Sequence, residues 1–322
     1  DLIQSIFMSI ALVVVVFFGI GQAGGLSAVM ENARSLPGYL HLTQGYDAAS
    51  GTAASFGFLP IVSTLAWGLG YFGMPHILLR FMAIEDEEKL SVSRRIASVW
   101  VVLSMGIAVL IGIIGYSVSA AGKVPYLSTS AESETIIVHL ADLMSQNGVL
   151  LAVMAGVILA GILAATMSTA DSQLLAASSA FASDVYKPVF RPKASDKEML
   201  WAGRYVVLVI SVIAVIIASN PNAGSIMSLV SNAWGVFGAA FGPVIMLSLF
   251  WKRFTFSGAV TGIVVGAAVD ILWLAFLSGT GIYEIIPGAA AGLLAAVIAS
   301  KLSKEPGPEV EALFDRGVAY EE

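Results

Sequence analysis

Long runs of apolar residues, separated by short polar stretches, fill most of the chain. A helix needs about 20 mostly apolar residues to cross the hydrocarbon core of a bilayer. This length rule predicts eight spanning helices, over approximately 1–23, 56–80, 96–121, 148–170, 201–219, 225–250, 256–278 and 285–302. The runs are continuous rather than alternating, which excludes transmembrane β-strands. The pattern therefore predicts an all-α membrane protein built as a polytopic helix bundle in contact with membrane lipid.

Composition agrees with this pattern and removes several classes of function. The chain is 57% hydrophobic and only 12% charged, far from the balance of soluble domains. It has no cysteine and three scattered histidines, so disulfides, thiolate metal sites and metal-hydrolase centres are disfavoured. The net charge of -6, without a basic stripe, argues against nucleic acid as a partner. Nor does the sequence pair a nucleophile with a base in the way that would indicate an enzyme.

The distribution of Lys and Arg predicts the orientation, because cytoplasmic loops carry the excess of these residues. With residue 1 inside, only Arg34 and Lys123 of the 16 basic residues fall in outer loops. We expect 1–302 to form the membrane domain and 303–322 a polar, mobile cytoplasmic tail.

The outer segment 130–147 has the spacing of a short amphipathic helix at the membrane surface. We expect the fourth span to continue as a helix to a break at Lys187 and Pro188. Since the sequence opens on an aspartate within an apolar run, it is interpreted as the C-terminal part of a longer protein.

The first candidate site is the most interrupted span, "STLAWGLGYFGMPHILLRFMA", residues 63–83. Irregular backbone survives at membrane depth only where protein or a water-filled cavity satisfies its polar groups. Trp67, Tyr71 and Pro75 are spaced i, i+4 and i+8, which in a continuous helix places them on one face. Such a face suits a small substrate with an apolar body and a charged amino-acid head. Close helix packing by glycines and interfacial anchoring by aromatics explain the same spacing equally well.

The second candidate site is "GILAATMSTADSQLL", residues 161–175. Ala165, Ser168 and Thr169 share one helical face, as do Ser168, Asp171 and Ser172. Hydroxyl, carboxylate and carbonyl oxygens are the ligands that hard cations such as Na⁺ prefer. The alternative is that each hydroxyl bonds to the carbonyl four residues earlier, and that Asp171 marks the end of the membrane crossing.

Further carboxylates and glycines lie within or beside spans. Asp1 is at the edge of the first apolar run, where it is either functional or solvated at the interface. Asp270 lies inside a span, either paired internally or acting as an ion relay. The glycines of the last two spans are spaced four apart, which predicts helix packing rather than ligand binding; they are Gly258, Gly262, Gly266, Gly288 and Gly292.

Three stretches carry a resemblance to a known family. They are "AWGLGYFGMPHILLRFMA", "ILAATMSTADSQLL" leading to "DVYK", and "AWGVFGAAFGPVIMLSLFWKR". Together they resemble the sodium/solute symporter family and, within it, the sodium/proline symporters, over residues 1 to about 302. Ala66 stands where the family often has glycine, and Met74 where glutamine is common.

The resemblance implies a fold like that of the bacterial leucine transporter, with two inverted repeats and binding sites at broken helices near the midplane. This chain would hold the second repeat and the trailing helices. The implied function is sodium-coupled uptake of L-proline across the bacterial cytoplasmic membrane, with the C-terminus in the cytoplasm. The alternatives are a sodium symporter for another small amino acid or organic solute, or a membrane-embedded sensor domain.

The resemblance also implies roles for individual residues. The residues matching the proline pocket and its gate are Trp67, Tyr71 and Pro75. Those matching the principal sodium site are Ala165, through its carbonyl, Ser168 and Thr169. A possible second sodium or coupling site would involve Asp1, Asp171 and Ser172, although Asp171 stands where relatives with a second ion have serine.

Overall fold

The computed structural model describes residues 2–48, 50–220 and 224–319, so the predicted site residue Asp1 lies outside the described residues. The chain divides into two compact units, each of which is described by itself. Unit 1 comprises Asp1–Ala54 and Ile84–Ile226, and unit 2 comprises Ser55–Ala83 and Met227–Glu322. Helices dominate both units. The described residues contain a single sheet, formed by β1 (Gln44–Asp47) and β2 (Thr52–Ser55).

Six helical segments among the described residues are long and apolar enough to cross a membrane. They are Glu87–Ala120, Val149–Phe190, Asp196–Ala218, Ile226–Phe250, Phe256–Thr280 and Ile285–Leu302. A bent pair at the N-terminal end brings the number to seven. The predicted polytopic helical membrane protein is confirmed, but the predicted span over 56–80 is wrong as a single helix. It is divided between α3 (Phe58–Gly70) and α4 (Pro75–Met82), because the chain leaves the helical path between them.

Unit 1 is built around four long helices and one short helix. They are α1 (Leu2–Gln22), α5 (Leu90–Ala120), α7 (Ile136–Ser145), α8 (Val149–Ala180) and α9 (Asp196–Ala218). Short elements join them: η1 (Glu87–Lys89), α6 (Ser130–Ser133) and the π-helix η2 (Phe181–Phe190). Its core is apolar, with Val15, Val118 and Leu140 completely buried. Burial of such side chains contributes roughly 1.5–3 kcal/mol each when the alternative environment is water.

The bend after α1 has a local cause in two glycines. The path turns by 81° between α1 and α2 (Leu26–Ser35). Gly24 and Gly25 between them have φ values of 91° and 101°, which side-chain-bearing residues rarely adopt. The sequence pattern predicted the apolar run over 1–23 but not this turn.

Two further sequence predictions for unit 1 need correction. The segment 130–147 does contain a short amphipathic helix, α7, but its apolar face is not at a surface. Leu140, Ala141 and Met144 are completely buried, because α7 packs against α1, α5 and α8. The helix after α8 does not break at Pro188 either. The helical path continues as η2, which contains Pro188 and ends at Phe190, although proline has no backbone N–H to donate.

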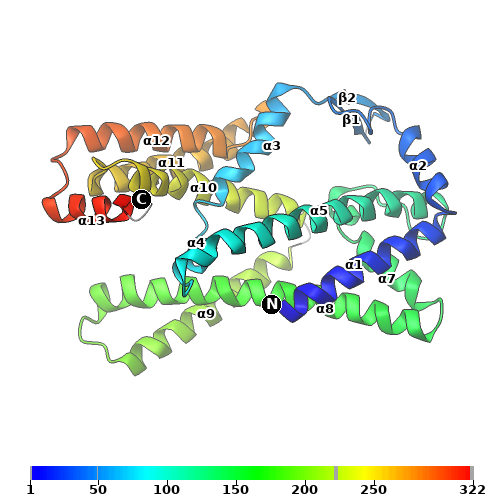
Figure 1. The fold of residues 1–322 in the computed structure, drawn as a ribbon, viewed down its shortest axis with the longest axis horizontal. Helices are drawn as coiled ribbons and strands as arrows, with labels where there is room; N and C mark the ends of the chain where they lie inside the picture. Colours follow the sequence, from blue (N-terminus) through cyan, green and yellow to red (C-terminus); the bar gives the residue numbers. More distant parts are fainter. Residues whose placement is uncertain (1, 49, 221–223, 320–322) are drawn as a thin grey trace. The chain divides into compact units, whose positions relative to one another are not determined.

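Unit 2 contains α3, α4, α10 (Ile226–Phe250), α11 (Phe256–Leu277), η3 (Ser278–Thr280), α12 (Ile285–Leu302) and α13 (Pro308–Ala319). Helices α11 and α12 run side by side (Figure 1), and their shared surface is made of small residues. A Cβ on Gly288 would lie 2.7 Å from the Ala239 Cβ, and one on Gly292 would lie 3.1 Å from the Gly262 carbonyl oxygen. The glycines spaced four apart therefore pack helices closely, as predicted.

Replacing Gly262 with alanine is expected to destabilise unit 2. Its Cβ would lie 2.9 Å from the Ala296 Cβ and 3.1 Å from Val244 Cγ2, so the helices must separate. Overpacking of this kind typically destabilises by about 1–3 kcal/mol. Thermal unfolding in detergent would measure the change. Gly106→Ala in α5 is the matched control because nothing lies within 4 Å of its Cβ position; equal melting of the two variants would contradict this packing.

The tail contains a helix, α13, which the sequence pattern did not predict. Helix α13 is tied to the α10–α11 loop by Lys252, whose Nζ lies 2.8 Å from Asp315 Oδ2 and 3.7 Å from Glu311 Oε2. The hydrogen bond from Lys252 to Asp315 raises the pKa of that lysine. The three partners are substantially exposed, so these ion pairs orient the tail rather than stabilise the fold strongly.

Candidate functional site

An aromatic cluster in unit 2 gathers at the end of α3. The ring of Trp67 stacks on that of Trp234 from α10, with centroids 5.5 Å apart, and on that of Tyr283, 6.1 Å away. Tyr71 meets Trp234 edge to face at 4.9 Å. Three segments distant in sequence thus contribute to one aromatic group.

Two hydrogen bonds fix the orientation of this aromatic cluster. The indole N–H of Trp234 donates to the Trp67 carbonyl oxygen at 3.0 Å, and the Tyr283 hydroxyl donates to the Ser231 carbonyl oxygen at 2.8 Å. Both aromatic side chains are partly buried, and their polar atoms are satisfied. A pre-oriented aromatic surface of this kind binds small apolar bodies with little loss of side-chain entropy.

The break between α3 and α4 depends on glycines that allow backbones to touch. A Cβ on Gly70 would collide with the Trp234 indole, and one on Gly73 would collide with the Phe237 carbonyl oxygen. Gly238 on α10 contributes to the same close contact, since a Cβ at this position would lie 2.7 Å from the Gly70 Cα. The glycines therefore act in packing, and the same packing holds the broken segment beside the aromatic cluster.

The single-face argument for the three predicted pocket residues is wrong for Pro75. It assumed a continuous helix, whereas Tyr71 is the C-cap of α3 and Pro75 begins α4 after a gap. Pro75 fixes φ near the helical value and needs no N–H partner at the first helical position. Trp67 and Tyr71 remain neighbours in the aromatic cluster, and Pro75 is an exposed residue at the start of the next helix.

Sequence reasoning missed Trp234 and Tyr283 as members of the cluster. Trp234 stands in the "AWGVFGAAFGPV" stretch that carried part of the family resemblance, but nothing in the sequence indicated which aromatic ring it would meet. Tyr283 lies in the short connection before α12 and had no motif around it.

The predicted sodium ligands lie on consecutive turns of α8 in unit 1. The Thr169 hydroxyl donates to the Ala165 carbonyl oxygen at 3.2 Å, and the Ser172 hydroxyl donates to the Ser168 carbonyl oxygen at 3.0 Å. The local bonding that the sequence offered as an alternative is therefore present for Thr169 and Ser172. A hydroxyl that donates its proton in this way keeps its lone pairs for a cation, so the two interpretations are compatible.

Two carboxylates were proposed beside this site. Asp1 lies outside the described residues, and Asp171 is exposed on α8, one turn from Ser168. No group of three or more His, Cys, Asp or Glu side chains among the described residues is arranged to hold a metal ion. A sodium site here would thus depend on hydroxyl and carbonyl oxygens rather than on a cluster of acids.

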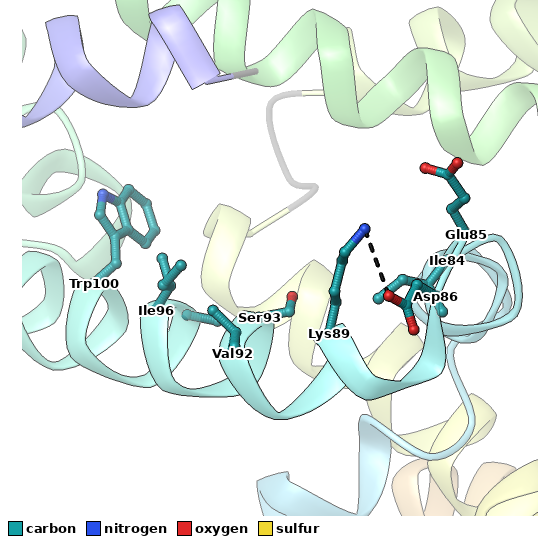
Figure 2. Close-up of a pocket in the computed structure, with 9 residues that line it drawn as sticks. Ile84, Glu85, Asp86, Lys89, Val92, Ser93, Ile96 and Trp100 are labelled. Carbon is teal, nitrogen blue, oxygen red and sulfur yellow. Dashed lines mark ion pairs between the residues drawn. The ribbon is translucent and has the colours of Figure 1, made fainter.

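A cavity of about 680 Å³ lies along the start of α5 in unit 1 and is not an enclosed binding site. Figure 2 shows its lining residues extending from one continuous stretch of chain. They follow a helical face from Lys89 through Ile96 to Trp100, and Lys89 pairs with Asp86 at 3.6 Å. None of the predicted site residues lines this cavity.

Comparison with known proteins supplies the family. The model of the Sodium:solute symporter family matches residues 1–266. The chain belongs to this family. The resemblance inferred from the three motifs is thereby confirmed, and so is the prediction that the protein is a member of a transporter family rather than an enzyme.

The similar curated relatives carry proline in their names. The high-affinity proline transporter PutP of Bacillus subtilis (strain 168) is 39% identical over 320 residues, covering 98% of this chain and 63% of that protein. The osmoregulated proline transporter OpuE of the same organism is 39% identical, with 98% and 60% covered. The sodium/proline symporter of Escherichia coli (strain K12) is 36% identical, with 99% and 61% covered. The chain thus spans about three fifths of the length of these relatives.

A solved structure shares the fold. It is that of a Na⁺-coupled sialic acid symporter in a substrate-bound outward-open state. The TM-score is 0.66 with 18% sequence identity, and the match covers 95% of this chain and 62% of that one. At this identity the comparison shows the helical fold of a symporter, and it carries no information on the solute of this chain.

Proposed function

We propose that this protein takes part in sodium-coupled uptake of L-proline across a bacterial cytoplasmic membrane. The observation that carries the proposal is family membership over residues 1–266 together with relatives named as proline transporters at 36–39% identity. Residues 1–302 would form the membrane domain and 303–322 a cytoplasmic tail. Sodium is a co-transported ion in this proposal rather than a bound cofactor.

The aromatic cluster of unit 2 suits the proposed substrate. Proline offers a compact apolar ring, which can pack on the faces of Trp67 and Tyr71, and a charged amino-acid head. The α3–α4 break places the end of one helix and the start of another beside this cluster, and broken helices of this kind hold charged groups in secondary transporters. Pro75, at the first position of α4, is proposed to set the path of this break.

The hydroxyl face of α8 suits the proposed ion. The Ala165 carbonyl and the Ser168 and Thr169 hydroxyls are the oxygens that would hold Na⁺, as the family resemblance implies. Asp171, Ser172 and Asp1 are proposed for a second sodium or coupling position. Coupling requires the ion to bind one conformation of the transporter more tightly than the other, because equal binding shifts no equilibrium. Each charge that enters with the solute adds about 2.3 kcal/mol per 100 mV of membrane potential.

Uptake of labelled proline into proteoliposomes containing the complete protein tests the proposal. We expect accumulation that requires an inward sodium gradient and that unlabelled proline competes away. Choline in place of sodium is the control for ionic strength. Sodium-dependent uptake of a different amino acid or organic solute, without competition by proline, would retain the symport and overturn the substrate. Proline uptake without sodium dependence would overturn the coupling.

A further inference from the structure

Unit 2 buries two carboxylates that the proposed transport does not use. Asp270 on α11 is completely buried, and Glu284, directly before α12, is 8% exposed. Both carboxylate oxygens of Asp270 and Oε1 of Glu284 are buried without a hydrogen-bond partner. An ionised carboxylate in such surroundings is strongly unfavourable unless a positive charge or donors accompany it. The pair therefore needs a ligand that supplies positive charge.

The two carboxylates face the same point on α10. A Cβ on Gly235 would lie 3.2 Å from Asp270 Oδ1 and 3.2 Å from Glu284 Oε1. The two oxygens are thus no further apart than twice that distance. Any larger side chain at position 235 would occupy this space, so the glycine leaves the carboxylates open to each other.

Within the residues that the structure describes, no basic side chain forms an ion pair with Asp270 or Glu284. The neighbouring titratable group is Tyr283, whose hydroxyl donates instead to the Ser231 carbonyl oxygen of α10. The Trp273 indole N–H, one turn beyond Asp270 on α11, is buried and also without a partner.

The ligand set is also too small for a calcium or magnesium ion. These divalent ions take about six or more oxygens, and Gly235 and its immediate apolar neighbours add no side-chain oxygen to the two carboxylates. The cavity of about 450 Å³ in this unit is lined elsewhere, by Leu69, Met246, Leu293 and other apolar residues, and includes neither carboxylate. Two buried carboxyls without a counter-charge are instead expected to keep one proton, because both cannot remain ionised in such surroundings.

We propose that Asp270 and Glu284 form a proton-binding site at the junction of α10, α11 and α12. Asp270, which is completely buried, carries the proton, and Glu284, which is 8% exposed, is the partner that exchanges it with water. The proton removes one of two buried negative charges, so the packing of the three helices depends on its presence. This site is independent of the solute that the protein transports.

The sign of the resulting pH dependence follows from proton counting. Carboxyls of the unfolded chain are ionised at neutral pH, whereas the folded protein retains one proton. The folded state therefore binds more protons, and the free energy of unfolding falls as the pH rises. This loss continues until the folded protein has released the proton as well.

Thermal unfolding in detergent, compared between about pH 6 and about pH 9, tests this prediction. We expect the wild-type midpoint to fall with rising pH, Asp270→Asn to remove most of that fall, and Glu284→Gln to reduce it. Glu309→Gln in α13 is the control, because Glu309 is exposed and should leave the wild-type slope unchanged. Equal slopes in wild type, Asp270→Asn and Glu284→Gln would overturn the proposal.

Infrared difference spectroscopy between the same pH values detects the proton directly and does not depend on the melting behaviour of any variant. A protonated-carboxyl band is expected in wild type and Glu309→Gln, at a shifted frequency in Glu284→Gln, and absent in Asp270→Asn. Its absence from wild type would overturn the site. Loss of the wild-type band on exchanging choline for sodium at constant pH would show a metal cation displacing the proton, and would also overturn it.

Discussion

Ser168→Ala and Thr169→Ala are each expected to raise the sodium concentration for half-maximal uptake by about ten- to a hundredfold. A hydroxyl that contacts a charged group contributes about 1.5–3 kcal/mol, and each 1.4 kcal/mol is a factor of ten. The measurement is initial uptake against sodium concentration in proteoliposomes, normalised to the amount of inserted protein. Since Thr169 also donates to the Ala165 carbonyl, its removal alters two of the three proposed ligands.

Thr166→Ala is the matched control for both variants. Thr166 lies on the same helix, and its hydroxyl makes the same kind of bond, to the Ile162 carbonyl oxygen at 2.9 Å. It has no place in the proposed sodium site. If Thr166→Ala shifts the sodium dependence as far as Ser168→Ala, the hydroxyls act on helix packing and the assignment of the ion to this turn fails.

Trp67→Ala is expected to weaken the affinity for proline by about tenfold or more. The substitution removes the ring that stacks on both Trp234 and Tyr283, and aromatic pairs contribute about 0.5–1.5 kcal/mol beyond the area they bury. It leaves the backbone carbonyl that accepts from the Trp234 indole, so the α3–α10 hydrogen bond survives. Competition of labelled proline uptake by unlabelled proline measures the change, and Trp67→Phe should restore part of it.

Trp201→Ala provides the comparison for Trp67→Ala. Trp201 contacts Tyr205 four residues later, with centroids 6.1 Å apart, which repeats the i, i+4 spacing of Trp67 and Tyr71 on a different helix. It should leave the proline affinity unchanged. A wild-type affinity in Trp67→Ala, with normal expression, would remove Trp67 from the pocket.

Local sequence information predicted the regular parts of the fold because hydrophobic length and periodicity act within one segment. The spans over 201–219, 225–250, 256–278 and 285–302 agree closely with α9, α10, α11 and α12. The prediction failed where non-local contacts decide the path. The span over 56–80 divides into α3 and α4 because Gly70 and Gly73 touch α10, and no window of the sequence contains both partners.

The candidate sites show the same division. The hydroxyl face of α8 lies within one helix, so the spacing in the sequence alone placed Ala165, Ser168 and Thr169 on one face. The aromatic cluster joins α3, α10 and the residue before α12, and only part of it was predicted. Asp270 was recognised as an intramembrane carboxylate, but its facing residue Glu284 was not, since the two meet across Gly235 on a third element.

The sequence by itself determined that this is a polytopic helical membrane protein of the sodium:solute symporter family, because apolar length and family motifs are properties of contiguous residues. Only the tertiary structure decided that α3 ends at Gly70, that Trp67 stacks on Trp234 and Tyr283, and that two acids share one buried point beside Gly235. The physical reason is that close packing brings together groups more than a hundred residues apart. Their mutual charge and shape exist only once the helices have met.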